Sequence, residues 1–274
     1  MNKNDFQLKI SEARKKIYKK RLNLFKICLG NDVRIFSEPK TGSTTMQNLI
    51  NSPWHMHYHS FRALKYIFPM HRNIRAFPLI LLITGFFTFC IKVKTKIFRK
   101  EVKIISTIRN PADRIASSFF FNLEHHFLKF RNSHPRAITN NLFSHEEIIE
   151  YIFDEFVDRW VNTYNFYDYF DFEIKKLTGI DVYKLDFDKQ KGFSIHKKGY
   201  FSLMIVDCYK IKELKNEIED FVGYQIDPAI KEMNSSNTKW YLEIYKRIYD
   251  QSKREEIENK LSKSKYLKHF YNAN

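Results

Sequence analysis

Cysteine is scarce in this sequence, which has only Cys28, Cys90 and Cys208 among 274 residues. Three widely separated cysteines form neither a disulfide framework nor the paired spacing of a zinc site. This scarcity excludes a small disulfide-stabilised secreted protein. It suits a reducing compartment, so we expect a cytoplasmic protein.

Glycine and proline are also scarce, with seven of each. So few of these residues argue against long disordered or low-complexity segments. Hydrophobic residues make up 43% of the chain, which is enough for a sizeable core. A chain of this length suits one large domain.

Long hydrophobic runs are missing as well. The most apolar segment, residues 77–91, has 15 residues, fewer than the roughly 20 that span a bilayer. Charges interrupt the basic N-terminus throughout, so we expect no signal peptide. A buried helix is the main expectation for 77–91. The alternative is a peripheral contact with an anionic membrane, at the inner face of the cell membrane, because basic residues flank the segment at Arg72, Arg75, Lys92, Lys94 and Lys96.

Acidic residues are outnumbered, with 31 Asp and Glu against 47 Lys and Arg, and the net charge is +16. Such a charge indicates an anionic partner: a nucleotide, an acidic glycan, a membrane surface or a nucleic acid. Charge alone does not choose among them. The basic residues are spread along the chain and match no known nucleic-acid-binding module, so no nucleic-acid partner is expected.

Strand-like and helix-like segments alternate along most of the chain, which predicts an α/β fold with a largely parallel sheet. Hydrophobic patterning predicts strands at 33–36, 54–60, 102–108 and 202–207. Helices are expected at 5–28, 44–50, 61–99, 112–130, 145–178 and 212–222, and over the last 35 residues. Ser144 and Glu147 have the spacing of a capping box at the start of helix 145–178.

We interpret residues 1–274 as a single domain in three parts. These are a basic N-terminal helix at 1–30, an α/β core at 31–235 and C-terminal helices at 236–274. Tyr241, Tyr245 and Tyr249 recur every four residues in the last part. We expect this stripe to pack in the core, because such spacing puts the three rings on one helix face.

The segment after the first strand, Pro39 to Thr45, has the composition of an anion-binding loop. A strand that runs into a glycine-containing turn and then a helix directs backbone N–H groups at a phosphate. Lys40 adds a mobile cation, Gly42 permits close approach, and hydroxyls come from Thr41, Ser43, Thr44 and Thr45. The loop is not that of a nucleotide triphosphatase, in which lysine follows the second glycine. Here the lysine precedes the glycine.

A second anion-binding element follows the strand 102–108. Arg109 stands at the end of that strand, where parallel sheets bind ligands, and Ser117 lies on the next helix. Together they could clamp one phosphate, through a guanidinium fork and a hydroxyl. Arg114 has two interpretations: a salt bridge at the helix start or a contact with the ligand.

These two elements resemble those of sulfotransferases that use 3′-phosphoadenosine 5′-phosphosulfate (PAPS). The resemblance implies that Lys40 contacts the bridging oxygen of the leaving phosphate, and that Thr41, Gly42, Ser43, Thr44 and Thr45 bind the phosphosulfate. Arg109 and Ser117 would then hold the 3′-phosphate. The implied fold is P-loop-like, with three layers, a central mainly parallel sheet and a helical C-terminal region. The implied product is 3′-phosphoadenosine 5′-phosphate (PAP).

Further segments resemble one bacterial branch, the capsular-polysaccharide-synthesis proteins named for an Asn-Lys-Trp-Tyr-Ser motif. They lie at residues 109–123, 172–183, 191–193, 237–241 and 264–271. The motif itself is altered, because Thr238 separates Asn237 from Lys239 and Leu242 stands in place of serine. The resemblance implies transfer of a sulfuryl group to a hydroxyl of a glycan, in particular a capsular or cell-surface polysaccharide.

Sulfuryl transfer needs a base for the acceptor hydroxyl, and histidine titrates near neutral pH. His55, His57 and His59 alternate along the expected strand 54–60, which puts them on one face. His59 is our first choice because it is nearest the ligand edge of the sheet, and His57 is the second. Glu38, beside the loop, is a third candidate. No carboxylate or cysteine accompanies the histidines, so no metal is expected.

Two other functions remain open from the sequence. A P-loop-like nucleotide kinase or hydrolase would need an acidic Mg²⁺ ligand at the end of a buried strand, and Asp207 has that place. A non-catalytic nucleotide- or polyanion-binding protein at the membrane surface would explain the charge and residues 77–91. His125, His126 and His196 are expected at the surface or in loops, and Lys197 to Gly199 could form a lid over an anionic substrate.

Overall fold

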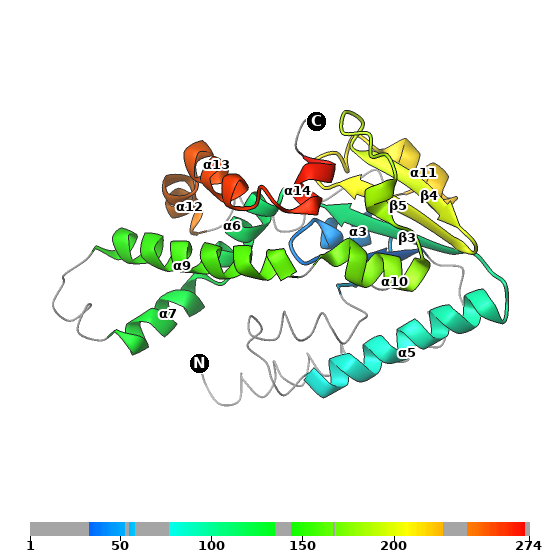
Figure 1. Ribbon diagram of the computed structural model, residues 1–274, viewed down its shortest axis with the longest axis horizontal. Helices are drawn as coiled ribbons and strands as arrows, with labels where there is room; N and C mark the ends of the chain where they lie inside the picture. Colours follow the sequence, from blue (N-terminus) through cyan, green and yellow to red (C-terminus); the bar gives the residue numbers. More distant parts are fainter. Residues whose placement is uncertain are drawn as a thin grey trace.

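The computed structural model describes residues 33–52, 55–57, 77–134, 144–166, 168–226 and 240–271. The expected N-terminal helix at 5–28 lies outside these ranges, as do His59 and the first part of the segment 61–99. A five-stranded sheet with the order β2-β1-β3-β5-β4 forms the centre of the described part (Figure 1). Its strands are β1 (Arg34–Phe36), β2 (His55–Met56), β3 (Val102–Ile108), β4 (Phe193–Lys198) and β5 (Phe201–Asp207).

Four of the strands are parallel, and only β4 runs antiparallel to its neighbour β5. This confirms the prediction of a mainly parallel sheet. Side chains of β3 alternate between the two faces, with Ile104 and Ile108 in one hydrophobic cluster and Ile105 in another. Both faces of the central strands are therefore covered, which explains why every residue of β3 except Lys103 is buried.

Helices cover both faces of the sheet, which gives three layers (Figure 1). On one face α3 (Ser43–Leu49) and α11 (Lys215–Val222) pack against Ile105 and Met204. On the other face Ile104 and Leu203 pack against helical side chains such as Ile174 and Phe270. The elements of that layer are α5 (Phe77–Lys96), the π-helix η3 (Phe170–Ile174), α10 (Lys175–Thr178), the short 3₁₀ turn η4 (Val182–Lys184) and α14 (Lys265–Phe270).

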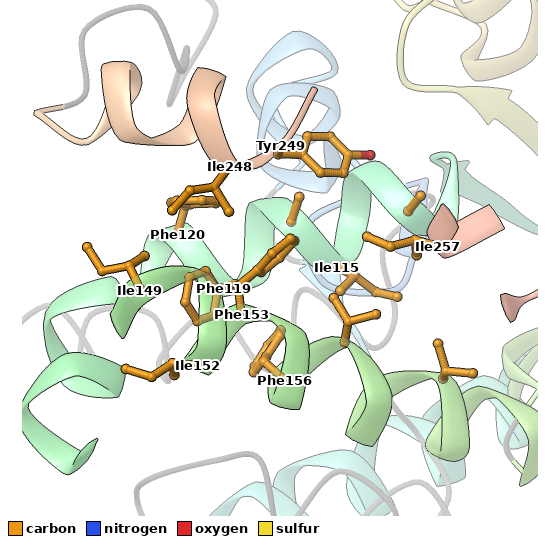
Figure 2. Close-up of a cluster of buried hydrophobic side chains, with 14 of the residues drawn as sticks. Ile115, Phe119, Phe120, Ile149, Ile152, Phe153, Phe156, Ile248, Tyr249 and Ile257 are labelled. Atoms are coloured by element: carbon orange, nitrogen blue, oxygen red, sulfur yellow. The ribbon is translucent and has the colours of Figure 1, made fainter. Parts of the chain in front are cut away.

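A further helical cluster lies beside the sheet. It is built from α6 (Pro111–Phe121), α7 (Leu123–Ser133), α9 (His145–Phe166), α12 (Leu242–Ile248) and α13 (Gln251–Lys260). Figure 2 shows Phe119 and Phe120 of α6 between Phe153 and Phe156 of α9 and the C-terminal helices. Tyr241, Tyr245 and Tyr249 also pack against this cluster, as the spacing predicted. This packing fixes the direction of α6, which begins directly after β3.

Two long helices expected from the sequence are interrupted in the structure. The segment 112–130 is divided at Asn122, which ends α6 and precedes α7. The segment 145–178 is divided into α9, η3 and α10. The expected capping box is present, because Glu147 N donates to Ser144 Oγ (3.2 Å) and Ser144 N to Glu147 Oε2 (2.7 Å).

The strand β4 was not predicted. It forms a hairpin with β5, closed at Gly199, whose φ of 57° suits glycine in a tight turn. His196 therefore lies in an edge strand and not in a loop. Among the described helices, α5 included, none combines the length and apolar character needed to cross a membrane.

Candidate functional site

The parallel strands bring four chain segments to one edge of the sheet. Because β1, β2, β3 and β5 are parallel, the residues after each strand lie at the same edge. These residues are the loop 37–42, His57, Arg109 and Tyr209. The two elements predicted to bind phosphate are therefore neighbours.

Buried hydroxyl groups fix the loop 37–42 against β3. Thr107 N and Thr107 Oγ1 donate to Ser37 Oγ, at 2.8 and 3.0 Å. Thr41 Oγ1 donates to Glu38 O (2.7 Å) and lies 3.0 Å from Thr107 Oγ1. All three side chains are 2% exposed or less. The hydroxyl of Thr41 therefore shapes the loop, and only the backbone of Thr41 remains for a ligand.

Gly42 is required by both its backbone and its surroundings. Its φ is 83°, and a Cβ added there would lie 3.0 Å from Cys208 Cβ. The next residues begin α3, with Ser43 buried and Thr44 and Thr45 partly exposed. The loop thus passes close to the segment after β5, and any larger residue at Gly42 would be strained and crowded against Cys208.

Lys40 has an unusual backbone conformation, with φ 66°. Its Nζ lies 3.0 Å from the centroid of the Phe121 ring, over the end of α6. Its carbonyl oxygen accepts a hydrogen bond from Arg109 Nη1 at 3.4 Å. A left-handed conformation is unfavourable for lysine, and it persists here because both ends of the residue are held.

Arg109 is held on several sides. Its N–H donates to Tyr266 Oη (3.1 Å), and Tyr266 Oη donates to Arg109 O (3.2 Å). Its Nε donates to Tyr209 Oη at 3.3 Å. Burial lowers the pKa of Arg109, but nearby Tyr209, Cys208 and Asp113 outweigh that effect and raise it overall. The guanidinium is a fixed positive charge at the edge where the strands end.

Arg114 forms a buried ion pair with Glu38, and both side chains are 6% exposed or less. The guanidinium also lies over the Trp160 ring, 5.6 Å from its centroid. This resolves the two interpretations of Arg114 in favour of a salt bridge. The pair joins α6 to the loop 37–42. It also means that the Glu38 carboxylate is occupied by Arg114.

Ser117 lies on the same face of α6 as Arg114 and Phe121, three residues after one and four before the other. Because Arg114 contacts Glu38 and Phe121 contacts Lys40, this face lies toward the loop. Ser117 is partly exposed. The structure therefore places Ser117 on the side of α6 that a ligand in the loop would face.

His57 follows β2 and contacts the neighbouring strand end. Its Nδ1 lies 2.8 Å from Ser37 O. A carbonyl oxygen only accepts, so Nδ1 carries the hydrogen, and in the neutral ring Nε2 bears the lone pair. The side chain of His55 and all of His59 lie outside the described residues.

The expected lid does not lie at this edge. β4 is antiparallel to β5, and Lys198 is paired with Phe201 at the start of that strand. Lys197 to Gly199 therefore lie at the opposite end of the sheet from the loop 37–42. Of the other histidines, His126 is partly buried and stacks on Phe119 at 5.1 Å. Burial lowers the pKa of His126 to about 4, so it is a packing residue.

Asp207 ends β5, as expected, but its Oδ1 accepts a hydrogen bond from Tyr209 N at 3.0 Å and closes a turn. Burial raises the pKa of its carboxyl. Within the described ranges, no group of three or more His, Cys, Asp or Glu side chains could hold a metal ion.

Three residues near Arg109 were not found from the sequence. They are Tyr209 and Tyr266, which contact Arg109, and Asp113, which binds Tyr209. Tyr209 follows a buried parallel strand, and that position was the available signal. Tyr266 lies 157 residues from Arg109, and only the packing of α14 on the sheet brings them together.

Comparison with known proteins gives two family matches. A sulfotransferase domain model matches residues 88–172, which contain β3, Arg109 and Ser117. The chain thus has the P-loop-like α/β fold that a sulfotransferase domain implies. The model of a family described as putative capsular polysaccharide synthesis protein, named NKWYS, matches residues 143–272. These matches confirm the family resemblance found in the sequence. No curated protein and no solved structure matches the chain significantly.

Proposed function

We propose that the protein transfers a sulfuryl group from PAPS to a hydroxyl of a glycan, in particular a capsular or cell-surface polysaccharide. The observation that carries the proposal is the hydrogen bond from Arg109 Nη1 to Lys40 O. It joins the loop predicted to bind the 5′-phosphosulfate to the residue predicted to bind the 3′-phosphate. One nucleotide with phosphates at both positions fits this arrangement.

The residues divide into three roles. Lys40 neutralises charge on the phosphate that leaves, helped by backbone N–H groups from Thr41 to Thr45. Arg109 and Ser117 bind the 3′-phosphate. Histidine takes the proton of the acceptor hydroxyl, and the two candidates are His59 and His57. The hydrogen bond from His57 Nδ1 to Ser37 O favours the tautomer that a base requires.

The transfer is an in-line displacement at sulfur. The acceptor oxygen forms a bond to sulfur while the bond from sulfur to the bridging oxygen breaks, and the proton passes to histidine. PAP leaves with the bonding electrons, and positive charge near the bridging oxygen stabilises it.

Calorimetric titration with PAP and with ADP tests the nucleotide part of the proposal. Both ligands carry two phosphate groups on adenosine, so the comparison keeps their number constant while the position of the second group changes. We expect PAP to bind at least about tenfold more tightly, the effect of one charged hydrogen-bonded pair. Equal binding of the two, unchanged by Arg109→Ala, would exclude this function and favour a kinase, a hydrolase or a general polyanion-binding protein.

Transfer itself is measured with ³⁵S-labelled PAPS and polysaccharide from the source cells. Mild acid hydrolyses the remaining PAPS, and label that stays on the polysaccharide after this treatment identifies the acceptor class. Label that appears only as free sulfate with every glycan offered would contradict the proposed acceptor.

A further inference from the structure

Tyr209 lies at the edge of the sheet next to Arg109. It follows β5 in a turn that Asp207 closes, with Tyr209 N donating to Asp207 Oδ1 at 3.0 Å and Lys210 N donating to Asp207 O at 2.9 Å. The Tyr209 side chain is 51% exposed, so its ring does not belong to the hydrophobic core. Its place at the ligand edge therefore needs another explanation than packing.

The hydroxyl of Tyr209 has a defined direction. Tyr209 Oη donates to Asp113 Oδ2, and Arg109 Nε donates to Tyr209 Oη at 3.3 Å. An ionised carboxylate only accepts hydrogen bonds, so the one hydroxyl hydrogen points to Asp113 and the oxygen lone pairs face Arg109. Although the residue is half exposed, partial desolvation of its hydroxyl beside Asp113 raises the pKa of Tyr209, and the charge of Asp113 adds to this, whereas Arg109 opposes it. The hydroxyl therefore stays protonated at neutral pH.

Asp113, which accepts the hydrogen bond from Tyr209, is itself held in position. It is 8% exposed and lies in the first turn of α6, where the helix dipole favours a negative charge. Tyr249 Oη donates to its other oxygen, Oδ1, at 2.7 Å, and Arg254 Nη2 lies 3.6 Å from Oδ2. Contacts from the C-terminal segment 249–254 thus hold the carboxylate in place, in addition to the one from Tyr209.

The result is a guanidinium with a restricted orientation. Tyr209 accepts from its Nε, Lys40 O accepts from its Nη1, and Tyr266 holds its backbone. A guanidinium can bind phosphate through Nε together with one Nη, or through its two Nη groups. With Nε bound to Tyr209 and one hydrogen of Nη1 bound to Lys40 O, an anion is left with Nη2 and the second hydrogen of Nη1.

We propose that Tyr209 is a positioning residue that gives the site its preference for a phosphate at the 3′ position of the nucleotide. It acts through Arg109, by linking the guanidinium to the anchored carboxylate of Asp113. This inference rests on the proposed function, since it assigns the selectivity of the same nucleotide site.

The chain offers a matched pair of variants. Tyr209→Phe and Tyr249→Phe each remove one hydroxyl that donates to Asp113, but only Tyr209 also contacts Arg109. Affinities for PAP and ADP are measured by calorimetry for the full chain and both variants. We expect Tyr209→Phe to lower the ratio of the two affinities about tenfold, the size of one hydrogen bond to a charged group. Tyr249→Phe should change the ratio less than about twofold, because its contact is to Asp113 alone.

A double-mutant cycle tests whether Tyr209 changes the ratio of the PAP and ADP affinities through Arg109. In an Arg109→Ala background, Tyr209→Phe should leave the ratio unchanged. The proposal is overturned if Tyr209→Phe keeps the ratio of the native chain, or if Tyr249→Phe lowers it equally, since the effect would then belong to Asp113. A native chain that binds PAP and ADP equally would instead reject the proposed function itself.

Discussion

Arg109 Nη1 lies 3.4 Å from the carbonyl oxygen of Lys40, so the two loops of the candidate site share a hydrogen bond. The residues are 69 positions apart in the sequence, on the ends of the adjacent parallel strands β1 and β3. A change in one loop should therefore affect the other.

The buried pair of Glu38 and Arg114 should matter for stability more than any exposed ion pair. Glu38→Gln leaves the guanidinium without its counterion, and we expect a loss of about 3 kcal/mol in the free energy of unfolding. Urea denaturation measures it. The exposed pair of Lys191 and Asp188 is the control, and Lys191→Ala should cost less than about 0.5 kcal/mol. Equal losses in both variants would contradict the assigned importance of burial.

Gly42→Ala should weaken both the fold and nucleotide binding. The residue has a φ of 83°, and the new Cβ would lie 3.0 Å from Cys208 Cβ. We expect a loss of about 1–2 kcal/mol from the left-handed conformation alone, with a further loss from the contact. Gly199→Ala is the control, because Gly199 also has a positive φ but has no atom within 4 Å of an added Cβ. It should lower the melting temperature and leave PAP affinity as it is.

Substitution of the two candidate bases should separate chemistry from binding. Replacing the base with alanine should lower kcat by about 10²–10⁴-fold and leave PAP affinity unchanged. His57→Ala and His59→Ala are compared by transfer of labelled sulfate from PAPS. If both variants keep the native rate, the base lies elsewhere. Loss of PAP binding together with activity would show that the residue shapes the nucleotide site instead.

Acid should destabilise the protein through His126. Burial lowers the pKa of this histidine from 6.5 to about 4 in the folded state, so below pH 6.5 the unfolded chain takes up a proton that the folded chain does not. The contribution of the neutral His126 ring to the free energy of unfolding is therefore fully present above pH 6.5, and it is lost as the pH falls from 6.5 toward 4. The loss amounts to about 3 kcal/mol.

His126→Phe should remove most of that pH dependence, because phenylalanine keeps the stacking on Phe119 and does not titrate. Melting temperatures between pH 4 and pH 7.5 measure it. His145, which is exposed at the start of α9, provides the control in His145→Gln. An unchanged slope in His126→Phe would mean that the acid sensitivity arises from other groups.

Local chemistry predicted much of this fold. The strand 102–108 was predicted with the bounds that β3 has, because a run of β-branched residues buried on both faces is a strong signal. β4 was missed, since an edge strand with exposed lysines and a histidine lacks that pattern. The break at Asn122 depends on how α7 packs beside α9, and the residues on either side favour helix.

The candidate site also contains one part that the sequence indicated and one part that only the structure shows. The loop from Pro39 to Thr45 has its composition within seven consecutive residues, so the sequence alone indicated it. The contacts that orient Arg109 come from Tyr209 and Tyr266, which are 100 and 157 residues away. No local pattern encodes such pairs, because tertiary packing alone creates them.

Tyr266 makes two hydrogen bonds to the backbone of Arg109, and this affects when the site can form during synthesis of the protein. When residues up to 226 have left the ribosome, both segments predicted to bind phosphate and the five described strands of the sheet have already been made. The hydroxyl that fixes Arg109 N and Arg109 O is still missing, because it arrives with α14. The nascent chain should therefore acquire the proposed nucleotide affinity only after α14 has emerged and packed on the sheet.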